Sequence, residues 1–527
     1  MFVNGRQDEP KHRTRVSGTA VNESSTPSAP DVVPAHDAEP PLAHRVVRGG
    51  LWVAASSYFN IGFGFLATLV LTRLLAPEDF GVFALAGFFF SFINLRPKIG
   101  IGYAFAQRKE TTGKLAGSYL ALDVSAGLAT LLLSAAAVPV LRVFGYPWDV
   151  ALVVLAFAGV GISDSVTGTA WVLLEKELHF GRASAVNSVM FPLSYAPAFY
   201  LAVRGGGFWS LIAQNATYAL LLLVGMWWTS RRCLPHIWRL HWQFDRETAI
   251  GLLRFGVVVG VAGMANMFVG QLDNFLVGTF VGLATLGFYE RAYRIAQWPT
   301  ALVTGVISRT AFYTYARLQS DPLRVQRAVT MTLWLITALA LPLALAIFVA
   351  APDLIRLLYG DRWLQSSLFL RFLIAYSVIR PLLDDVGSLF VAIGRPRLTA
   401  VVSITQAITL AAVGTALTLR FGAPGTCVAV GVTFSIGLLL TYRYAVRLIA
   451  IRLWDALGWP AVAALVTMLG YFILVRPLIV GTWPLVIAVA GKMVYASLTY
   501  FAVTFALRPR ATIERATYVW RLAWTRE

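Results

Sequence analysis

The stretch AVTMTLWLITALALPLALAIFVA, residues 328–350, decides the fold class. It contains 23 consecutive residues without a charged side chain, and a helix of about 20 such residues crosses the hydrocarbon core of a bilayer. Similar runs recur along the chain, which has 527 residues, 57% of them hydrophobic and only 13% charged. A soluble protein has about 25% charged residues. The sequence therefore predicts an all-α polytopic membrane protein.

From Gly50 onward the hydropathy predicts about 14 transmembrane helices, separated by short loops rich in Gly, Pro and Arg. The expected spans are 51–71, 82–106, 118–138, 150–172, 183–203, 208–230, 251–272, 284–307, 328–350, 366–393, 398–419, 424–446, 457–479 and 483–507. We expect two six-helix lobes followed by two further helices. The expected segments are an N-terminal lobe at 49–230, a cytoplasmic linker at 231–250, a C-terminal lobe at 251–446, and helices 13 and 14 with a cytoplasmic tail at 447–527.

Residues 1–48 precede the first span and are rich in Pro, Ser and acidic residues. Because this composition cannot bury a core and contains no apolar run of a signal peptide, it predicts a disordered cytoplasmic tail. The net charge of +18 is explained by arginines and lysines gathered in cytoplasmic loops, and it does not indicate a nucleic-acid partner. That distribution places both termini in the cytoplasm, with the chain in a cytoplasmic membrane.

An internal repeat occurs at an offset of 206 residues. LLAPEDFGVFALA (Leu74–Ala86) aligns with FVGLATLGFYERA (Phe280–Ala292), so that Gly81 matches Gly287. Both segments lie between the first and second spans of a six-span block, and six is an even number. The two lobes are therefore expected to form a parallel pseudo-repeat, which is an architecture of transporters with a site between the halves.

Four segments carry a resemblance to a known family. They are TRLLAPEDFGVFALA (Thr72–Ala86), IGIGYAFAQRKE (Ile99–Glu110), LDNFLVGTFVGLATLGFYERAYRIAQWP (Leu272–Pro299) and SLFVAIGRPRL (Ser388–Leu398). Their order and content resemble the Wzx-type polysaccharide flippases of the multidrug/oligosaccharidyl-lipid/polysaccharide exporter superfamily. The resemblance implies translocation of undecaprenyl-pyrophosphate-linked oligosaccharide between the leaflets of the bacterial inner membrane. Many members carry an acidic residue where this chain has Lys98, so a role of that position is not carried over.

Basic residues within the spans are the candidates for substrate binding, because a charge in the membrane needs a functional or structural reason. Arg291, Arg294 and Trp298 share one helix face and offer two guanidinium groups for a pyrophosphate and an indole ring for a sugar. The alternative is a self-neutralising Glu290–Arg294 pair, which leaves Arg291 unexplained. The further substrate-binding candidates are Arg380, Lys98 and Arg73. Arg73 could equally be an interfacial anchor.

Acidic residues within the spans are the candidates for ion coupling. Asp384 and Asp385 follow Arg380 and Pro381, where a helix kink is expected. One arginine cannot pair with both aspartates on one face, so one of them is expected to carry a proton; a structural ion pair at the kink is the alternative. Two further candidates are Glu290 and Asp273, the latter either binding a cation or capping a helix.

Further charged residues within apolar stretches bear on the fold. Arg96 and Lys98 flank Pro97 and predict a discontinuous helix. Asp123 and Asp164 are acids without an evident partner in the sequence, and Lys492 is expected to extend its amine to the membrane surface.

The leading functional hypothesis is an ion-coupled flippase that works by alternating access. Its partners would be lipid-linked oligosaccharide, membrane lipid and other polysaccharide-assembly proteins, and neither a cofactor nor a metal is expected. The sequence contains no phosphate-binding GxxxxGK[ST] loop and no HExxH motif, and no enzymatic activity is predicted. The alternatives are a multidrug exporter of the same superfamily and a membrane polysaccharide polymerase or ligase. A multidrug exporter would need an acidic residue that attracts cationic drugs. A polymerase or ligase would need a long extracytoplasmic loop that carries catalytic groups.

Overall fold

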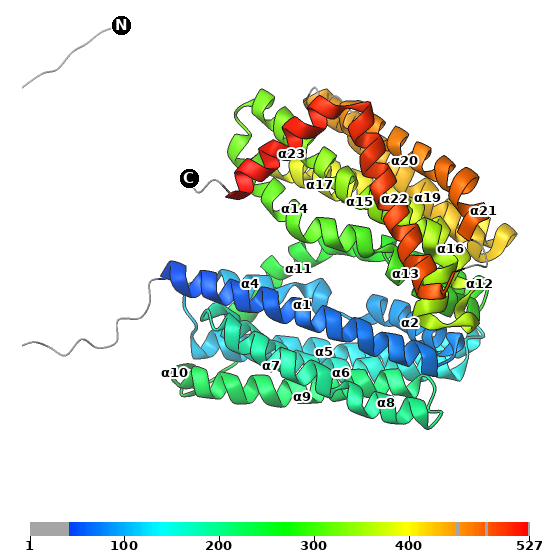
Figure 1. Cartoon of the computed structure of the whole chain (residues 1–527). Helices are drawn as coiled ribbons and strands as arrows, with labels where there is room; N and C mark the ends of the chain where they lie inside the picture. Colours follow the sequence, from blue (N-terminus) through cyan, green and yellow to red (C-terminus); the bar gives the residue numbers. More distant parts are fainter. Residues whose placement is uncertain (1–41, 450–453, 480–482, 525–527) are drawn as a thin grey trace, which may run out of the picture. The chain divides into compact units, whose positions relative to one another are not determined.

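The computed structural model describes residues 42–449, 454–479 and 483–524, and every regular element in these residues is helical. Of the tail expected at residues 1–48, residues 1–41 lie outside the described residues. Helix α1 begins at Leu42. Figure 1 shows two groups of helices within the part of the chain that follows residue 45. Their long apolar runs confirm the predicted all-α class and a multi-pass membrane protein.

The first group, the N-terminal bundle, contains nine helical elements. Those from α2 to α9 contact one another mainly through α5, α6 and α9, and α1 packs on α7 and α8 through Phe63. They are α1 (Leu42–Leu74), α2 (Pro77–Ile93), α3 (Arg96–Ile99), α4 (Ile101–Gln107), α5 (Gly113–Val143), α6 (Trp148–Lys176), α7 (Phe180–Leu193), α8 (Tyr195–Val203) and α9 (Trp209–Cys233).

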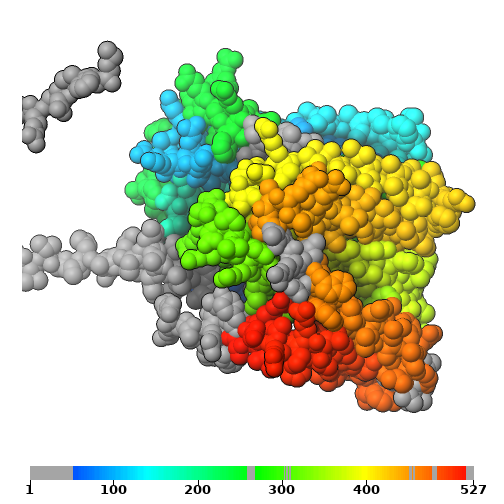
Figure 2. Space-filling model, turned by 90° about the horizontal axis from the view of Figure 1, so that it is seen from above, coloured from blue at the N-terminus to red at the C-terminus, as the bar shows by residue number. Residues whose placement is uncertain are grey.

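The second group, the C-terminal bundle, is packed around the long helix α15, which contacts α14, α16 and α22. Its α-helices are α12 (Leu272–Phe280), α13 (Leu283–Ala296), α14 (Trp298–Leu318), α15 (Pro322–Tyr359), α16 (Ser366–Ser377), α17 (Ile379–Ala392), α18 (Pro396–Thr409), α19 (Thr415–Leu448), α20 (Trp459–Gly470), α21 (Arg476–Ile479) and α22 (Leu485–Leu507). It is followed by α23 (Pro509–Trp524). Figure 2 shows one face of this bundle, on which the yellow, orange and red segments lie next to one another.

The described residues contain ten helices that are long and apolar enough to span a membrane. One of them, the stretch Pro396–Leu448, covers two of the predicted spans, which meet at a kink where the backbone of Gly422 is not helical (φ +65°). The shorter apolar helix Trp459–Val475 falls on another predicted span. The spans predicted at 251–272 and 284–307 coincide with α11 (Arg246–Val269) and with the α13–α14 pair, which is interrupted at Gln297. The count of 14 therefore stays a prediction.

The discontinuous helix predicted around Pro97 is confirmed. α2 ends at Ile93, the single turn α3 follows, and α4 begins after Gly100, which adopts φ +51°. A proline cannot continue the hydrogen-bond ladder behind it, and glycine tolerates the left-handed conformation that redirects the chain. The break places polar side chains, among them Arg96, inside the N-terminal bundle.

The connection between the two bundles is fixed to α5. After the short helix α10 (Pro235–Trp238), the chain runs so close to α5 that a Cβ on Gly113 would lie 2.3 Å from the carbonyl oxygen of His241. The backbone N–H of Asp245 donates to Ser118 Oγ at 2.9 Å. Thr248 donates its hydroxyl and its backbone N–H to the Asp245 carboxylate, and these bonds lower the pKa of Asp245. The next helix, α11, contacts α3, α4 and α5 on one side and α18 on the other.

The two bundles meet most closely where α2 crosses α13. A Cβ on Gly81 would lie 1.8 Å from the carbonyl oxygen of Leu283, and a Cβ on Gly287 would lie 1.8 Å from that of Pro77. The offset of 206 residues that aligns Gly81 with Gly287 also aligns Pro77 with Leu283. The two contacts are therefore equivalent under the repeat: the glycine of each helix faces the carbonyl of the other. Such reciprocal contacts are what a two-fold axis between two similar units produces. The predicted internal repeat therefore appears as a symmetric contact.

Candidate functional site

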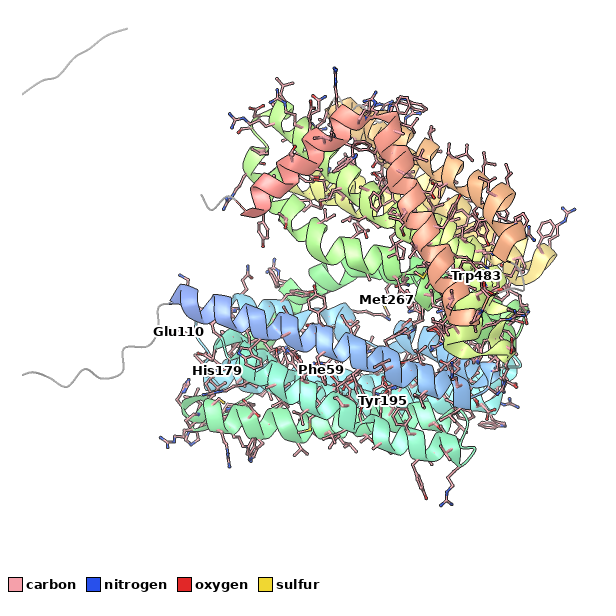
Figure 3. All side chains as sticks on the ribbon, in the orientation of Figure 1. Phe59, Glu110, His179, Tyr195, Met267 and Trp483 are labelled. Carbon is pink, nitrogen blue, oxygen red and sulfur yellow. The ribbon has the colours of Figure 1, made fainter. Side chains whose placement is uncertain are left out.

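A cavity of about 400 Å³ lies between the bundles, and we call it the inter-bundle cavity. It brings together Arg291, Arg294 and Trp298, as the helical spacing predicts. The remaining lining residues come from α1, α7, α8 and α15, and they are Asn60, Ile61, Gly64, Phe65, Thr68, Phe191, Tyr195 and Tyr359. Tyr195 is labelled on the N-terminal bundle in Figure 3. The cavity therefore combines guanidinium groups with an aromatic wall.

The charges beside this cavity form a cluster of three residues. Glu290 accepts from Arg291 Nε at 2.7 Å and from Arg294 Nε at 2.6 Å. Arg291 is 4% exposed, lies 4.2 Å from the centre of the Phe80 ring and also contacts Thr72 Oγ1. The interpretation that a glutamate pair would leave Arg291 unexplained is wrong, because one carboxylate has two oxygens and pairs with both arginines.

The two arginines differ in what they can still offer to a ligand. Arg291 uses both Nε and Nη2 on Glu290 and is buried against Phe80. The side chain of Arg294 is 66% exposed and contacts Glu290 through Nε. A guanidinium has five N–H donors, so Arg294 keeps its terminal nitrogens for the cavity.

The aromatic wall is held in place by ring packing. Trp298 and Phe65 meet edge to face with ring centres 5.4 Å apart. Phe191 and Tyr195 meet in the same way at 5.4 Å. Rings fixed in this manner present flat apolar faces, against which the carbon skeleton of a sugar ring can stack.

A second cavity of about 440 Å³ lies within the C-terminal bundle, and we call it the acidic cavity. It brings together three of the predicted site residues, Asp273, Arg380 and Asp384. Its polar lining also includes Tyr293, Ser388, Thr399, Ser403, Gln406, Thr433 and Thr441. Gln406 Nε2 and Thr433 Oγ1 are buried here without a hydrogen-bond partner among the described residues. This cavity is therefore rich in oxygen atoms and carries donors that are not used within the described chain.

The other predicted acids lie outside the acidic cavity. Asp385 is fully buried, and its two carboxylate oxygens share the single hydroxyl proton of Tyr315, with Oη···O distances of 3.2 and 3.1 Å. Among the described residues no ion pair joins Arg380 to either aspartate within 4.0 Å, so the expected structural pair at the kink is absent there. The kink itself appears as the break between α16 and α17, just before Pro381.

Asp273 is held at the start of α12. Its Oδ2 accepts from Tyr289 Oη at 2.8 Å, and its Oδ1 accepts from the backbone N–H of Asn274 at 2.9 Å. Asp273 is 3% exposed. The carboxylate lies in the first turn of α12, where Gln271 is the N-cap residue, and it also lines a polar cavity, so cation binding by Asp273 stays a prediction.

Two predicted substrate-binding residues lie away from both cavities. Arg73 donates from Nε and Nη2 to the carbonyl oxygens of Leu358 and Leu357, at 3.1 and 2.6 Å. It therefore joins the end of α1 to the end of α15. Lys98 donates to the carbonyl oxygen of Phe92 across the break that follows α2.

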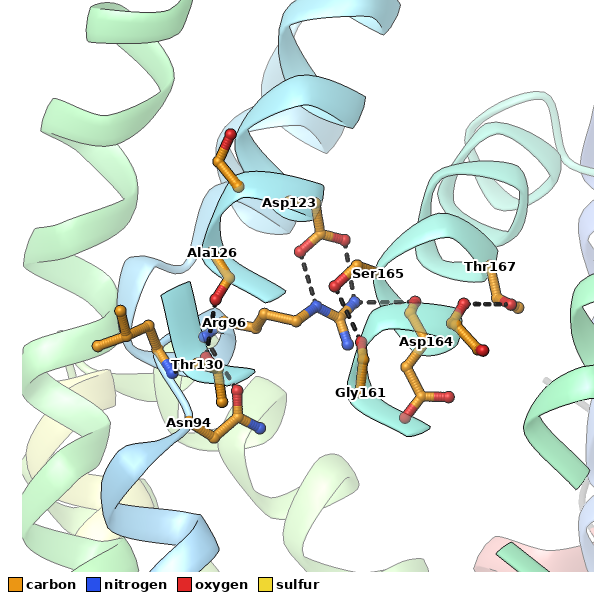
Figure 4. A network of polar contacts seen from close by, with 12 residues as sticks. Asn94, Arg96, Asp123, Ala126, Thr130, Gly161, Asp164, Ser165 and Thr167 are labelled. Carbon is orange, nitrogen blue, oxygen red and sulfur yellow. Dashed lines mark hydrogen bonds and ion pairs between the residues drawn. The ribbon is translucent and has the colours of Figure 1, made fainter. Parts of the chain in front are cut away.

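One ion pair in the N-terminal bundle, with a buried aspartate and a partly buried arginine, was not predicted from the sequence (Figure 4). Arg96 donates from Nε and Nη2 to the two carboxylate oxygens of Asp123, at 2.8 and 2.9 Å, and from Nη2 to the carbonyl oxygen of Asp164 at 3.0 Å. The pair joins α3 to α5, and the two residues are 27 positions apart. The break at Pro97 is the signal that could have drawn attention to Arg96.

The expectation for Lys492 is also wrong. Its side chain pairs with Asp353 and so joins α22 to α15, and Lys492 is only 8% exposed. Once both groups are buried, each compensates the charge of the other, and removing either partner would leave a buried charge without compensation.

Comparison with known proteins adds independent findings. Residues 70–368 match the model of a family described as "Polysaccharide biosynthesis protein". A succinoglycan biosynthesis transport protein, ExoT of Rhizobium meliloti, is 25% identical over 326 residues, which cover 61% of this chain and 64% of the relative. A "Probable low-salt glycan biosynthesis flippase", Agl15 of Haloferax volcanii, is 21% identical over 88% of this chain and 96% of the relative.

The fold is also found among solved structures. A structure entitled "Lipid II flippase MurJ, inward closed conformation" superimposes with a TM-score of 0.68 at 12% identity, covering 88% of this chain and 100% of that one. At this identity the likeness concerns the fold, and it agrees with the arrangement of helices into two bundles.

Proposed function

The chain belongs to a family of polysaccharide biosynthesis proteins, and from this premise we propose that it flips a lipid-linked oligosaccharide across the cytoplasmic membrane. The substrate class is a polyprenyl-pyrophosphate-linked oligosaccharide, with undecaprenyl as the lipid in a bacterial inner membrane. Both termini would lie in the cytoplasm. Relatives named as a transport protein and as a flippase support movement of a substrate rather than its chemical conversion.

The observation that carries the proposal is the inter-bundle cavity. Arg294 would contact the anionic pyrophosphate, because its terminal nitrogens are free of Glu290. Arg291, held on Glu290 and Phe80, would keep the cluster in place. Trp298 and the neighbouring rings would stack on the first sugar. The lipid chain would stay in the bilayer, so the cavity needs to hold the polar head group alone.

The test is the leaflet distribution of the lipid-linked oligosaccharide in cells depleted of this protein. We expect it to accumulate on the cytoplasmic leaflet, where a membrane-impermeant glycosidase added from outside cannot reach it. Normal surface polysaccharide combined with altered resistance to cationic dyes would contradict the proposal and indicate a drug exporter.

For energy coupling, we propose that a proton or a sodium ion acts at the acidic cavity. Asp273 and Asp384 are the acids that line it, with Arg380 as their internal counter-charge. Asp385 accepts from Tyr315 and Glu290 holds two arginines, so we assign both of these acids a structural role. Charged groups inside a membrane protein commonly mark such ion pathways.

The Asp384→Asn variant tests this assignment. In proteoliposomes with an imposed proton or sodium gradient, we expect its transport rate to lose the dependence on the gradient, because the amide cannot change its charge. An unchanged response of the variant would remove Asp384 from the coupling site.

A further inference from the structure

Helix α13 forms a wall of both cavities, and its two sides carry different chemistry. With 3.6 residues per turn, residues two positions apart point about 160° away from each other. Tyr289 and Tyr293 therefore share one side of the helix, while Gly287, Arg291 and Arg294 share the other. The first side faces the acidic cavity and the second faces the inter-bundle cavity.

The tyrosine side of α13 is tied to the acidic cavity through one hydrogen bond. Tyr289 is fully buried, and its hydroxyl donates to Asp273 at 2.8 Å. Tyr293, which lines the acidic cavity, stacks on Tyr289 with ring centres 6.1 Å apart. Any change in the charge of Asp273 thus acts directly on α13, because a hydrogen bond to a carboxylate is about twice as strong as one to a neutral group.

The opposite side of α13 carries the parts that would have to move during transport. Arg294 lines the inter-bundle cavity, and Gly287 makes half of the close contact with α2. Because this contact leaves no space for a Cβ, it fixes the position of α13 relative to the N-terminal bundle. A small shift of α13 therefore alters the head-group cavity and the contact between the bundles together.

We propose that Tyr289 is a positioning residue that couples cation occupancy at Asp273 to the inter-bundle cavity, an inference that rests on the proposed function. With Asp273 charged and free of a cation, the Tyr289 hydroxyl holds α13 against α12. A proton or sodium ion on Asp273 competes with that hydroxyl and releases α13, which moves Arg294 and Gly287. A ligand shifts a conformational equilibrium of a protein only if it binds the two conformations with different affinities. The hydrogen bond from Tyr289 to Asp273 would make the cation affinity of Asp273 differ between the two positions of α13.

Other ionisable groups also face Asp273 and have to be considered in a pH experiment. Among the described residues they are Tyr289 and Tyr293 on α13, Arg380 and Asp384 on α17, and Cys427 on α19. From α2, the described neighbours of α12 are apolar, with Phe88 and Phe89 packed on Phe275 and Leu85 next to Gly278. A sodium titration at constant pH therefore has to accompany the pH series.

The experiment compares Tyr289→Phe with Tyr315→Phe in the purified full-length protein. Tyr315 also donates its hydroxyl to a buried aspartate, Asp385, but it lies on α14 and lines neither cavity. The first readout is the Kd of inorganic pyrophosphate measured by calorimetry across pH and sodium concentration. The second is gradient-driven transport of a polyprenyl-pyrophosphate-linked oligosaccharide in proteoliposomes. Because every variant meets the same ligand, ionisation of pyrophosphate itself cancels in the comparison.

In the wild-type protein we expect proton or sodium binding to change the Kd of pyrophosphate at least about fivefold, the lower end of ordinary couplings between sites. Tyr289→Phe should lose this change and the gradient response, whereas Tyr315→Phe should keep both. Asp273→Asn serves as a second variant and should also lose the cation dependence. Thermal unfolding of each variant shows whether it is folded.

Three outcomes are decisive. A cation-dependent Kd that persists in a folded Tyr289→Phe variant overturns the inference and leaves the proposed function intact. Loss of the dependence in Tyr315→Phe as well also overturns it, because the effect would then not be specific to α13. A cation-dependent Kd that requires Tyr289, in a protein that moves no lipid-linked oligosaccharide, supports the coupling and refutes the proposed function.

Discussion

The repeat-related helices α2 and α13 share their contact residues and differ in their charges. Gly81 and Gly287 occupy matching positions and make reciprocal contacts. Along the same alignment, Ala84, Leu85 and Phe88 of α2 correspond to Glu290, Arg291 and Arg294 of α13. Leu85 is buried in the apolar core, and the buried ring of Phe88 packs on other phenylalanine rings. The comparison shows that the packing of the bundles depends on the two glycines, which both helices share. The charged residues of α13, which α2 lacks, belong to the cavity.

The largest expected effect concerns the shared part of the comparison. Gly81→Ala and Gly287→Ala should each abolish transport, because the new methyl group would lie 1.8 Å from a carbonyl oxygen of the other bundle. Since the contact is reciprocal, the two variants should fail in the same manner. Transport in proteoliposomes, with spin-label distances between the bundles, measures this.

Gly87→Ala is the matched control for both glycine variants, because a Cβ at Gly87 meets nothing within 4 Å. It should transport at the wild-type rate. If Gly81→Ala is impaired and Gly287→Ala is not, the symmetry of the contact has no functional meaning.

The next effect concerns the buried half of the charged cluster. Arg291→Ala leaves Glu290 with one partner, and breaking a buried ion pair by removing one member costs about 3–5 kcal/mol. We expect a clear loss of unfolding free energy or of the unfolding temperature in detergent. A variant as stable as the wild type would show that Arg294 alone compensates Glu290.

The smallest effect concerns the exposed half of that cluster. Arg294→Ala should weaken the binding of inorganic pyrophosphate by about 1.5–3 kcal/mol, the usual contribution of hydrogen bonds to a charged group, which is about 10- to 150-fold in Kd. Stability should change less than in Arg291→Ala, since the Arg294 side chain is mostly exposed.

Phe88→Leu, at the position in α2 that matches Arg294, is the control for this variant. It should leave the affinity for pyrophosphate unchanged. Equal affinities of Arg294→Ala and the wild type would exclude Arg294 from the binding site.

Much of the fold and part of the site could be predicted because the relevant patterns are local. Apolar runs predict the helices, a proline between two cations predicted the break after α2, and a spacing of three and four residues placed Arg291, Arg294 and Trp298 on one cavity. The offset of 206 residues identified the two repeat-related segments, and the structure adds that they contact each other.

The remaining features depend on contacts between distant segments. Arg96 finds Asp123, and Lys492 finds Asp353 139 positions away, through packing that no local pattern encodes. Glu290 could not be assigned two partners from spacing alone, because adjacent residues such as Glu290 and Arg291 do not ordinarily face each other on a helix. The hydrogen bond of Tyr289 to Asp273 likewise joins two helices across a turn.

The end of α1 is bound to the C-terminal bundle by hydrogen bonds from side chains to main-chain carbonyl oxygens. Arg73 donates to two carbonyl oxygens at the end of α15, and the Trp363 indole donates to the carbonyl oxygen of Thr72 at 2.9 Å. These bonds involve neighbouring residues, so none of them can lengthen far while the others persist. Separation at this end should therefore be a cooperative, all-or-none step. We expect a single-exponential relaxation between two discrete populations, on the microsecond-to-millisecond timescale of collective domain motions, rather than a continuous range of partly opened forms.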